Sequence, residues 1–180
     1  MIFGATKVGA VFAISTFFLF SLNGCSSSPK VKSQAYAQLS SRRTFEYSFP
    51  TVWKALEESL RKFKVVDRDP NEVDVVELKQ LKRRSLKTDW IYSQSRDKYI
   101  EYAVNGSPRK TYLQTRYRYS IVAQKTLGGI DVNVNVDEEI EKLKNDGSSA
   151  GYDSVSDVDP TRASEFLDRL NQAVLAAPAI

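Results

Sequence analysis

The side chains that most often perform catalysis are scarce in this sequence. It contains no histidine and one cysteine, Cys25, among 180 residues. Because histidine supplies most acid–base catalysts and most zinc and copper ligands, neither kind of site is expected. A nucleophile would need a lysine or a carboxylate as its base. A single cysteine also excludes a disulfide within the chain.

Two carboxylate-rich segments come closest to a chemical site. The first has the opening spacing of a calcium-binding loop, but it lacks the turn glycine and the final glutamate of such loops. The second precedes the last expected helix, where solvated loop and capping residues are usual. We therefore predict no metal, no cofactor and no catalytic residue. The segments contain Asp67, Asp69 and Asn71, and Asp153, Asp157 and Asp159.

Basic residues are better candidates, and they point to binding. The 26 Lys and Arg exceed the 22 Asp and Glu by too little to predict a nucleic-acid partner. One basic cluster is interpreted as a solvated loop, a contact with an acidic protein, or a contact with lipid headgroups or lipopolysaccharide phosphates. A second group combines arginine with tyrosine, as protein interfaces do. The groups are Lys79, Lys82, Arg83, Arg84 and Lys87, and Arg116, Tyr117 and Arg118.

The N-terminal segment predicts export and a lipid anchor. Residues 1–24 have one basic residue, an apolar centre and small residues at the end, which is the layout of a secretory signal. Leu22, Gly24 and Cys25 resemble the lipobox of bacterial lipoproteins. That resemblance implies a diacylglycerol on the cysteine thiol, cleavage before Cys25 and, because serine follows, delivery to the outer membrane. Residues 25–41 are then expected to be a flexible tether.

Two amphipathic helices are predicted in the single domain expected over residues 42–177. The first starts at Pro50, with Ser48 as a nearby cap. The second follows Asp159, a suitable cap, and ends before Pro178. Their apolar stripes are Val52, Ala55, Leu56, Leu60 and Phe63, and Ala163, Phe166, Leu167, Leu170, Ala173 and Val174.

Antiparallel strands are expected around these helices, because apolar and polar residues alternate in several segments. The basic cluster is expected to interrupt any regular element, residues 73–81 fit no single element, and residues 145–157 are expected to be a polar loop. The expected strands outside the main hairpin cover residues 44–49, 64–68, 86–92 and 99–104, and a turn is expected at 105–108.

The main hairpin is expected around Gly128 and Gly129. If these two glycines are the central turn residues, Leu127 faces Ile130. The apolar residues then share one face and opposite charges meet on the other. This register sets Ala123 opposite Val134 and Ile121 opposite Val136, with Arg118 near Glu139 and Arg116 near Glu141.

The element order predicts an α+β domain: an antiparallel sheet of about five to six strands with two helices on one face. The chain also resembles the helix-grip domains of the BamC family, lipoproteins of the outer-membrane β-barrel assembly machinery. The resemblance implies a helix-grip fold over roughly residues 42–175 and barrel-assembly subunits as partners. It is carried by Val52-Trp53-Lys54-Ala55-Leu56, Asp67-Arg68-Asp69, Lys87-Thr88-Asp89-Trp90 and Arg116-Tyr117-Arg118-Tyr119.

These observations predict a non-enzymatic outer-membrane lipoprotein, anchored through Cys25 and facing the periplasm, that binds another envelope protein as an assembly accessory. The alternative is a lipoprotein that binds a lipid or small ligand between its last helix and the sheet; a periplasmic hydrolase ranks third. A large apolar cavity would favour the carrier, and a filled core with an exposed tyrosine–arginine surface would favour the interaction module. The candidate protein-binding residues are Arg116, Arg118, Tyr117, Lys82, Arg83 and Arg84.

Overall fold

The computed structural model describes residues 30–33 and 37–177, so the predicted signal segment and Cys25 lie outside the described part of the chain. The described residues form strands and helices in an order that confirms the α+β prediction. In chain order the elements are β1 (Lys32–Ser33), β2 (Arg42–Phe45), α1 (Phe49–Ser59), β3 (Val65–Asp69), α2 (Val75–Gln80), β4 (Arg83–Thr88), β5 (Ile91–Val104), β6 (Ser107–Thr126), β7 (Gly129–Leu143), β8 (Ser149–Ser154) and α3 (Thr161–Ala176).

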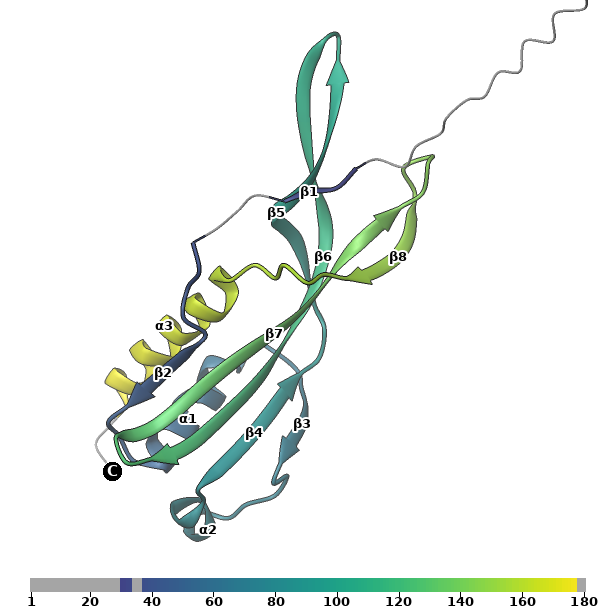
Figure 1. Ribbon diagram of the computed structural model, residues 1–180. Coiled ribbons are helices and arrows are strands. Elements are labelled where there is room, and N and C mark those ends of the chain that lie inside the picture. Colours follow the sequence, from purple (N-terminus) through teal and green to yellow (C-terminus); the bar gives the residue numbers. More distant parts are fainter. Residues whose placement is uncertain (1–29, 34–36, 178–180) are drawn as a thin grey trace, which may run out of the picture.

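The antiparallel sheet is organised around its two longest strands, β6 and β7, which pair with each other. On the other edge of β6, β5 pairs with the first part of the strand and β4 with the second, and β3 adds to β4. On the other edge of β7, β2 pairs near its start and β8 near its end. The sheet therefore changes its outer strands along its length and curls around the helices (Figure 1).

Helices α1 and α3 cover one face of the sheet, as predicted (Figure 1). The Ser48 side chain accepts a hydrogen bond from the Thr51 N–H and so caps α1. The Asp159 carboxylate accepts one from the Thr161 N–H, at 3.0 Å, at the start of α3. Both apolar stripes enter the core, where Trp53 and Phe166 are almost fully buried. Each such side chain stabilises the fold by about 1.5 to 3 kcal/mol relative to an exposed position.

The predicted register of the main hairpin was wrong by two residues. Thr126 pairs with Gly129, so Leu127 and Gly128 are the central turn residues. Gly129 lies instead at the start of β7, where a Cβ would overlap the carbonyl oxygen of Phe45 in β2. A shift of two keeps every side chain on its face, so the hydrophobic pattern cannot detect it. The observed pairs are Ala123 with Val132, Ile121 with Val134, Arg118 with Asp137, and Arg116 with Glu139.

Two polar segments form strands where none was expected. The prediction that the basic cluster interrupts regular structure was wrong, because β4 runs through it. The inward position there is filled by Arg84, which is 6% exposed and lies with its Cζ 4.6 Å from the Trp53 ring centroid. Residues 145–157 are likewise not all loop, since they contain β8. In both strands the alternation is hidden because polar residues occupy both faces.

Two short elements, α2 and β1, lie in segments for which no helix or strand was predicted. The ambiguous residues 73–81 contain α2, which starts with a capping box between Asp74 and Glu77. The predicted tether contains β1, which pairs with β5.

None of the helices in the described part of the chain is long and apolar enough to cross a membrane.

A long hairpin projects beyond the rest of the sheet (Figure 1). It consists of the end of β5 and the start of β6, beyond an irregularity in the pairing between Gln94 and Tyr99. Its turn is formed by Asn105 and Gly106, which both have positive φ angles, 51° and 78°. This is the backbone of a two-residue hairpin turn.

Candidate functional site

The strand that carries the predicted binding residues divides them between the two faces of the sheet. On β6, Tyr117 and Tyr119 point toward the helices, and Tyr119 is packed against Phe166 of α3. Arg116 and Arg118 therefore point to the opposite face, which we call the outer face. The candidate binding residue Tyr117 therefore lies on the opposite face from the two arginines, because successive side chains alternate across a strand.

On the outer face the two arginines stack on the aromatic rings of Trp90 and Tyr152, which come from two other segments. The Arg116 Cζ lies 4.8 Å from the Trp90 ring centroid and 4.7 Å from that of Tyr152 in β8. The Arg118 Cζ lies 4.4 Å from Trp90. Tyr92 of β5 meets Tyr152 edge to face at 6.1 Å. We call Trp90, Tyr92, Arg116, Arg118 and Tyr152 the arginine–aromatic cluster.

Carboxylates on β7 hold both arginines in place. Arg116 Nε donates to Glu139 Oε2 at 2.7 Å, and Arg118 Nε donates to Asp137 Oδ2 at 2.8 Å. Hydrogen bonds to Tyr92 and Glu139 raise the pKa of Arg116. The arginine side chains remain about 30% exposed, and Tyr92 is 63% exposed. The cluster is therefore a fixed, partly exposed surface whose charge is balanced by its own carboxylates.

Of the predicted basic cluster, Lys82, Arg83 and Arg84 do not join this surface, whereas the Lys87 ammonium lies 3.9 Å from Asp137, the partner of Arg118. Arg84 is buried against Trp53, and its guanidinium also donates to the carbonyl oxygens of Pro70 and Asn71. Burial lowers its pKa. Lys82 and Arg83 are exposed, but Arg83 pairs with Gln124, six residues along β6 from Arg118.

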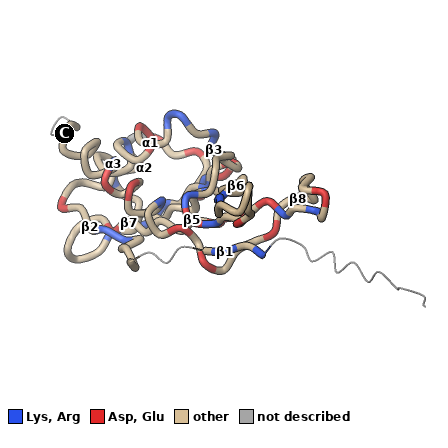
Figure 2. Tube along the Cα trace, turned by 90° about the horizontal axis from the view of Figure 1, so that it is seen from above, with Lys and Arg blue, Asp and Glu red and all other residues tan. Residues whose placement is uncertain are grey.

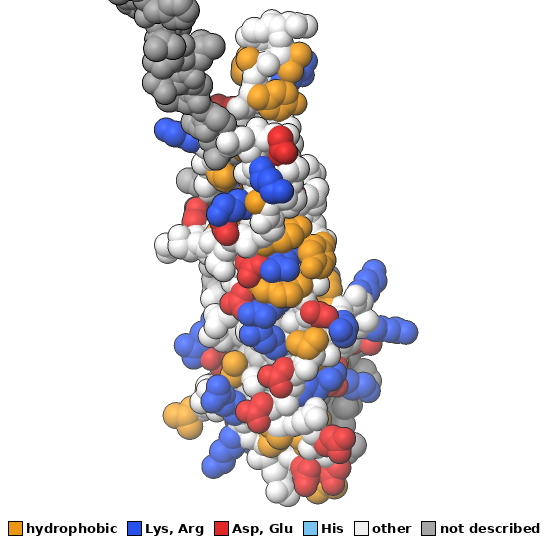
Figure 3. Space-filling model, turned by 90° about the vertical axis from the view of Figure 1, so that its right-hand side faces the viewer, with side chains coloured by type: hydrophobic (Ala, Val, Ile, Leu, Met, Phe, Trp, Pro, Cys, Tyr) orange, Lys and Arg blue, Asp and Glu red, His pale blue; other side chains and the backbone are white. Residues whose placement is uncertain are grey.

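Basic and acidic residues are interspersed along the whole described chain (Figure 2). They are also mixed on the side of the molecule shown in Figure 3, where hydrophobic side chains gather near the middle.

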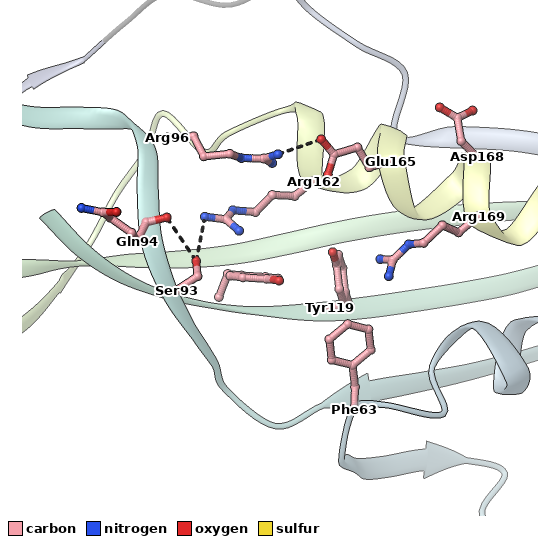
Figure 4. Close-up of a pocket in the computed structure, with 10 residues that line it drawn as sticks. Phe63, Ser93, Gln94, Arg96, Tyr119, Arg162, Glu165, Asp168 and Arg169 are labelled. Carbon is pink, nitrogen blue, oxygen red and sulfur yellow. Dashed lines mark hydrogen bonds and ion pairs between the residues drawn. The ribbon is translucent and has the colours of Figure 1, made fainter. Parts of the chain in front are cut away.

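A groove of about 570 Å³ lies between α3 and the sheet (Figure 4). The Arg162 guanidinium lies 3.9 Å from the Tyr117 ring centroid on its floor. Arg169 approaches Phe63 at its mouth, 5.7 Å from the ring centroid. Burial raises the pKa of the Tyr119 phenol, which also lines the groove, to about 12. Charged and hydroxyl groups line much of this groove, so it is not the large apolar cavity expected of a lipid carrier.

Behind the groove is a network of buried charges that the sequence analysis did not identify. Glu138 of β7 is at its centre, 3.3 Å from Arg162 and 3.6 Å from Lys98. Lys98 also contacts Asp97 at 2.7 Å, and Arg162 lies 3.8 Å from Asp159. All five side chains are at most 6% exposed. The network fixes the start of α3 to the irregular part of β5 and to β7.

Two serine motifs occur in the sequence without a catalytic setting. Gly147-x-Ser149-x-Gly151 has the letters of a nucleophile elbow, but it forms an exposed turn and the start of β8 rather than a strand-to-helix turn. Ser95 and Lys98 have S-x-x-K spacing, but both are buried and Lys98 is paired with Asp97 and Glu138. The Lys98 ammonium contacts carboxylates rather than the Ser95 hydroxyl, which donates to Asp97, so neither motif assembles a nucleophile with its base.

The carboxylates considered as cation ligands are engaged elsewhere or dispersed. Asp153 pairs with Lys142 at 3.1 Å, and Asp157 accepts a hydrogen bond from Ser33. In the described residues, no group of three or more potential ligands is placed to hold a metal.

No protein-family model matches the chain, and no curated protein matches it. Function is therefore inferred from the chain's own geometry.

Proposed function

We propose that the protein is a lipid-anchored lipoprotein of the outer membrane that binds another envelope protein through its arginine–aromatic cluster. It acts without catalysis, as a structural or assembly accessory in the manner of the BamC helix-grip lipoproteins that the sequence resembles. The observation that carries this proposal is an ordered, partly exposed arrangement of Trp90, Tyr92, Arg116, Arg118 and Tyr152 on the face of the sheet opposite helices α1 and α3.

The chemistry of the cluster suits protein recognition. Tryptophan, tyrosine and arginine contribute most of the binding energy at many protein interfaces. Arg116 and Arg118 are held by Glu139 and Asp137, so little side-chain freedom is lost on binding. Because these ion pairs balance the charge, the partner is expected to be held by ring and guanidinium stacking. Its affinity should then change little with salt concentration.

The filled core supports the same proposal. The space between the two long helices and the sheet is occupied by large buried side chains, including Trp53, Leu56, Phe166 and Leu170. Such close packing leaves little room for an acyl chain. The helix-grip assignment rests on the sequence resemblance together with the packing of α3 across the sheet. Barrel-assembly subunits are the partners that this resemblance suggests.

A photo-crosslinking amino acid at position 92 tests the proposal in cells. Tyr92 lies in the cluster, whereas Val76 of α2 has a similar exposure, 66% against 63%, outside it. Irradiation should join the position-92 variant to one envelope protein, and the position-76 variant should give no such adduct. Replacing Trp90 by Ala should weaken the adduct at position 92. Equal adducts from both positions, or none from position 92, would contradict the proposal.

The anchor has its own test. Cys25→Ala should move the protein from the membrane fraction to the soluble fraction of the cell, because two or more acyl chains are needed for stable attachment. A Ser26→Ala variant is the matched control and should remain in the membrane fraction. If the Cys25→Ala protein still sediments with membranes, the lipid anchor is wrong.

Small-ligand binding is a second candidate, favoured by the groove beside α3. Its volume of about 570 Å³ lies within the usual range of ligand sites. Its charged and hydroxyl lining suits a polar ligand better than a lipid. Native mass spectrometry of the protein extracted from its own envelopes tests this candidate. A bound small molecule that is lost in Tyr117→Ala would support ligand binding, and a protein of unchanged mass would exclude it.

A further inference from the structure

We propose that the tip of the projecting hairpin, residues 101–110, rests on the phospholipid headgroups of the membrane that holds the anchor. This inference depends on the proposed acylation of Cys25. The juxtaposition that carries it is the antiparallel pairing of β1 with the base of the hairpin, which points the N-terminal end of β1 toward the hairpin tip.

The direction follows from the strand pairing. β1 is antiparallel to β5, with Lys32 opposite Tyr99 and Ser33 opposite Lys98. The N-terminal end of β1 therefore points in the direction in which β5 runs to its turn. The contact between the Lys32 ammonium and Glu101, two residues further along β5, follows the same line. The position of β5 where β1 pairs with it is fixed, because the side chain of Lys98 is buried in an ion pair with Asp97.

The lengths also agree. Six residues separate Cys25 from Lys32, so the two can lie at most about 23 Å apart. From Tyr99 to the turn at Asn105 the hairpin extends six residues, or about 20 Å. An acylated Cys25 therefore keeps the base of the hairpin within about one hairpin length of the membrane. With the tip directed toward the membrane, there is room for headgroups but not for another domain.

The composition of the tip fits a headgroup layer. Every residue from 101 to 110 is exposed, and Tyr102 and Val104 are 48% and 45% exposed. Arg109 lies directly opposite Tyr102, and the one acidic residue of the tip, Glu101, is paired with Lys32. Tyrosine is enriched at membrane interfaces, and basic residues are attracted to anionic phospholipids. Lys110 supports the hairpin by stacking on Tyr99 at 4.3 Å.

An added strand from a partner protein suits this hairpin less well. Pro108 lacks an N–H group, and proline and basic residues on an edge strand are the usual protection against pairing with another strand. The base of the β5 edge is already occupied by β1. The exposed apolar side chains are thus better matched by a lipid surface than by a strand.

A fluorescent label measures which end of the molecule meets the membrane. The sequence has one cysteine, so once Cys25 is acylated a new cysteine is the only reactive thiol. Val104→Cys labels the hairpin tip. Leu127→Cys labels the turn at the other end of β6, where Leu127 is fully exposed. The acylated proteins are placed in vesicles of phosphatidylethanolamine and phosphatidylglycerol that contain a headgroup nitroxide lipid, and quenching of the two labels is compared.

The label at position 104 should be quenched at least about twofold more than the label at position 127. Adding Tyr102→Ser and Arg109→Ser should reduce this difference. Equal quenching on protein that sediments with the vesicles would overturn the membrane contact and leave the anchor intact. Acylated protein that fails to sediment would overturn both. If the label at position 104 is not quenched in the vesicles, and a photo-crosslinking amino acid at the same position forms an adduct with a protein in whole envelopes, a protein partner would replace the membrane.

Discussion

Glu138 at the centre of the buried network provides the sharpest test of what stabilises the fold. Its side chain is fully buried. It accepts hydrogen bonds from the Thr115 hydroxyl at 3.1 Å, the Asp159 N–H at 2.9 Å and the Arg162 guanidinium at 3.3 Å. It also lies 3.6 Å from the Lys98 ammonium. We predict that Glu138→Gln, which changes the charge with almost no change in shape, strongly destabilises the protein.

The expected loss follows from these contacts. Glutamine has one acceptor oxygen where glutamate has two, so two of the four donors lose this acceptor whichever way the amide turns. Each unsatisfied buried donor costs about 1 to 3 kcal/mol. Breaking a buried ion pair from one side costs about 3 to 5 kcal/mol. We therefore expect the free energy of unfolding to fall by about 3 to 5 kcal/mol, a large part of a typical domain's stability.

Urea unfolding followed by far-ultraviolet circular dichroism measures this change in a Cys25→Ala background. The matched control is Glu58→Gln on α1, where Glu58 pairs with Arg61 at 3.3 Å but both side chains are largely exposed. The control should unfold near the parent's midpoint, because exposed ion pairs contribute little. If Glu138→Gln unfolds at the same urea concentration as the control, the buried charge network does not contribute to the free energy of unfolding.

Three further predictions concern single positions. Gly129→Ala should destabilise the fold by about 1 to 3 kcal/mol in urea unfolding, because the φ of Gly129 is +128° and an added Cβ would overlap Phe45. Gly128→Ala is the control: an added Cβ there has no atom within 4 Å, so the stability should change little. Burial alone would raise the pKa of Asp159, but hydrogen bonds and neighbouring arginines lower it below its ordinary value of 3.8. A lowered carboxyl pKa stabilises the fold above the unfolded pKa, and this contribution is lost as the pH falls through the folded value. Asp159→Asn should therefore lose less stability than the parent as the pH falls from about 5 to about 2. Tyr119→Phe should remove the tyrosinate absorbance that appears near pH 12, and a loss at lower pH instead would contradict the assignment.

The fold could be predicted from the sequence wherever one face of an element is apolar. The stripes of α1 and α3 and the alternation of β6 and β7 directly identify elements and buried faces. The register could not be fixed, because a shift of two changes neither face. The first half of β4 was missed because Arg84 replaces an apolar inward residue, and β8 was missed because it is short and mostly polar.

The candidate site was predicted only in part. Arg116 and Arg118 were identified, but the three aromatic rings that complete the cluster all come from residues 24 or more positions away along the chain: Trp90 and Tyr92 before β6, and Tyr152 in β8. The buried network was missed because charged residues are normally exposed. The sequence did contain a signal for it. Glu138 continues the every-second-residue series Val132, Val134 and Val136, whose side chains face the core side of the sheet, so its side chain is expected on that side too.

One strand, β6, connects both proposed contacts and sets the distance between them. Arg109 lies at the hairpin tip and Arg118 in the arginine–aromatic cluster, nine residues further along the same strand. At about 3.3 Å per residue, the cluster would lie about 30 Å from the headgroups on which the tip rests. A partner embedded in the bilayer could then reach the cluster only with a domain that extends into the periplasm. The adduct expected at position 92 should therefore map to such a periplasmic domain, and an adduct within a membrane-embedded segment would contradict the combined orientation.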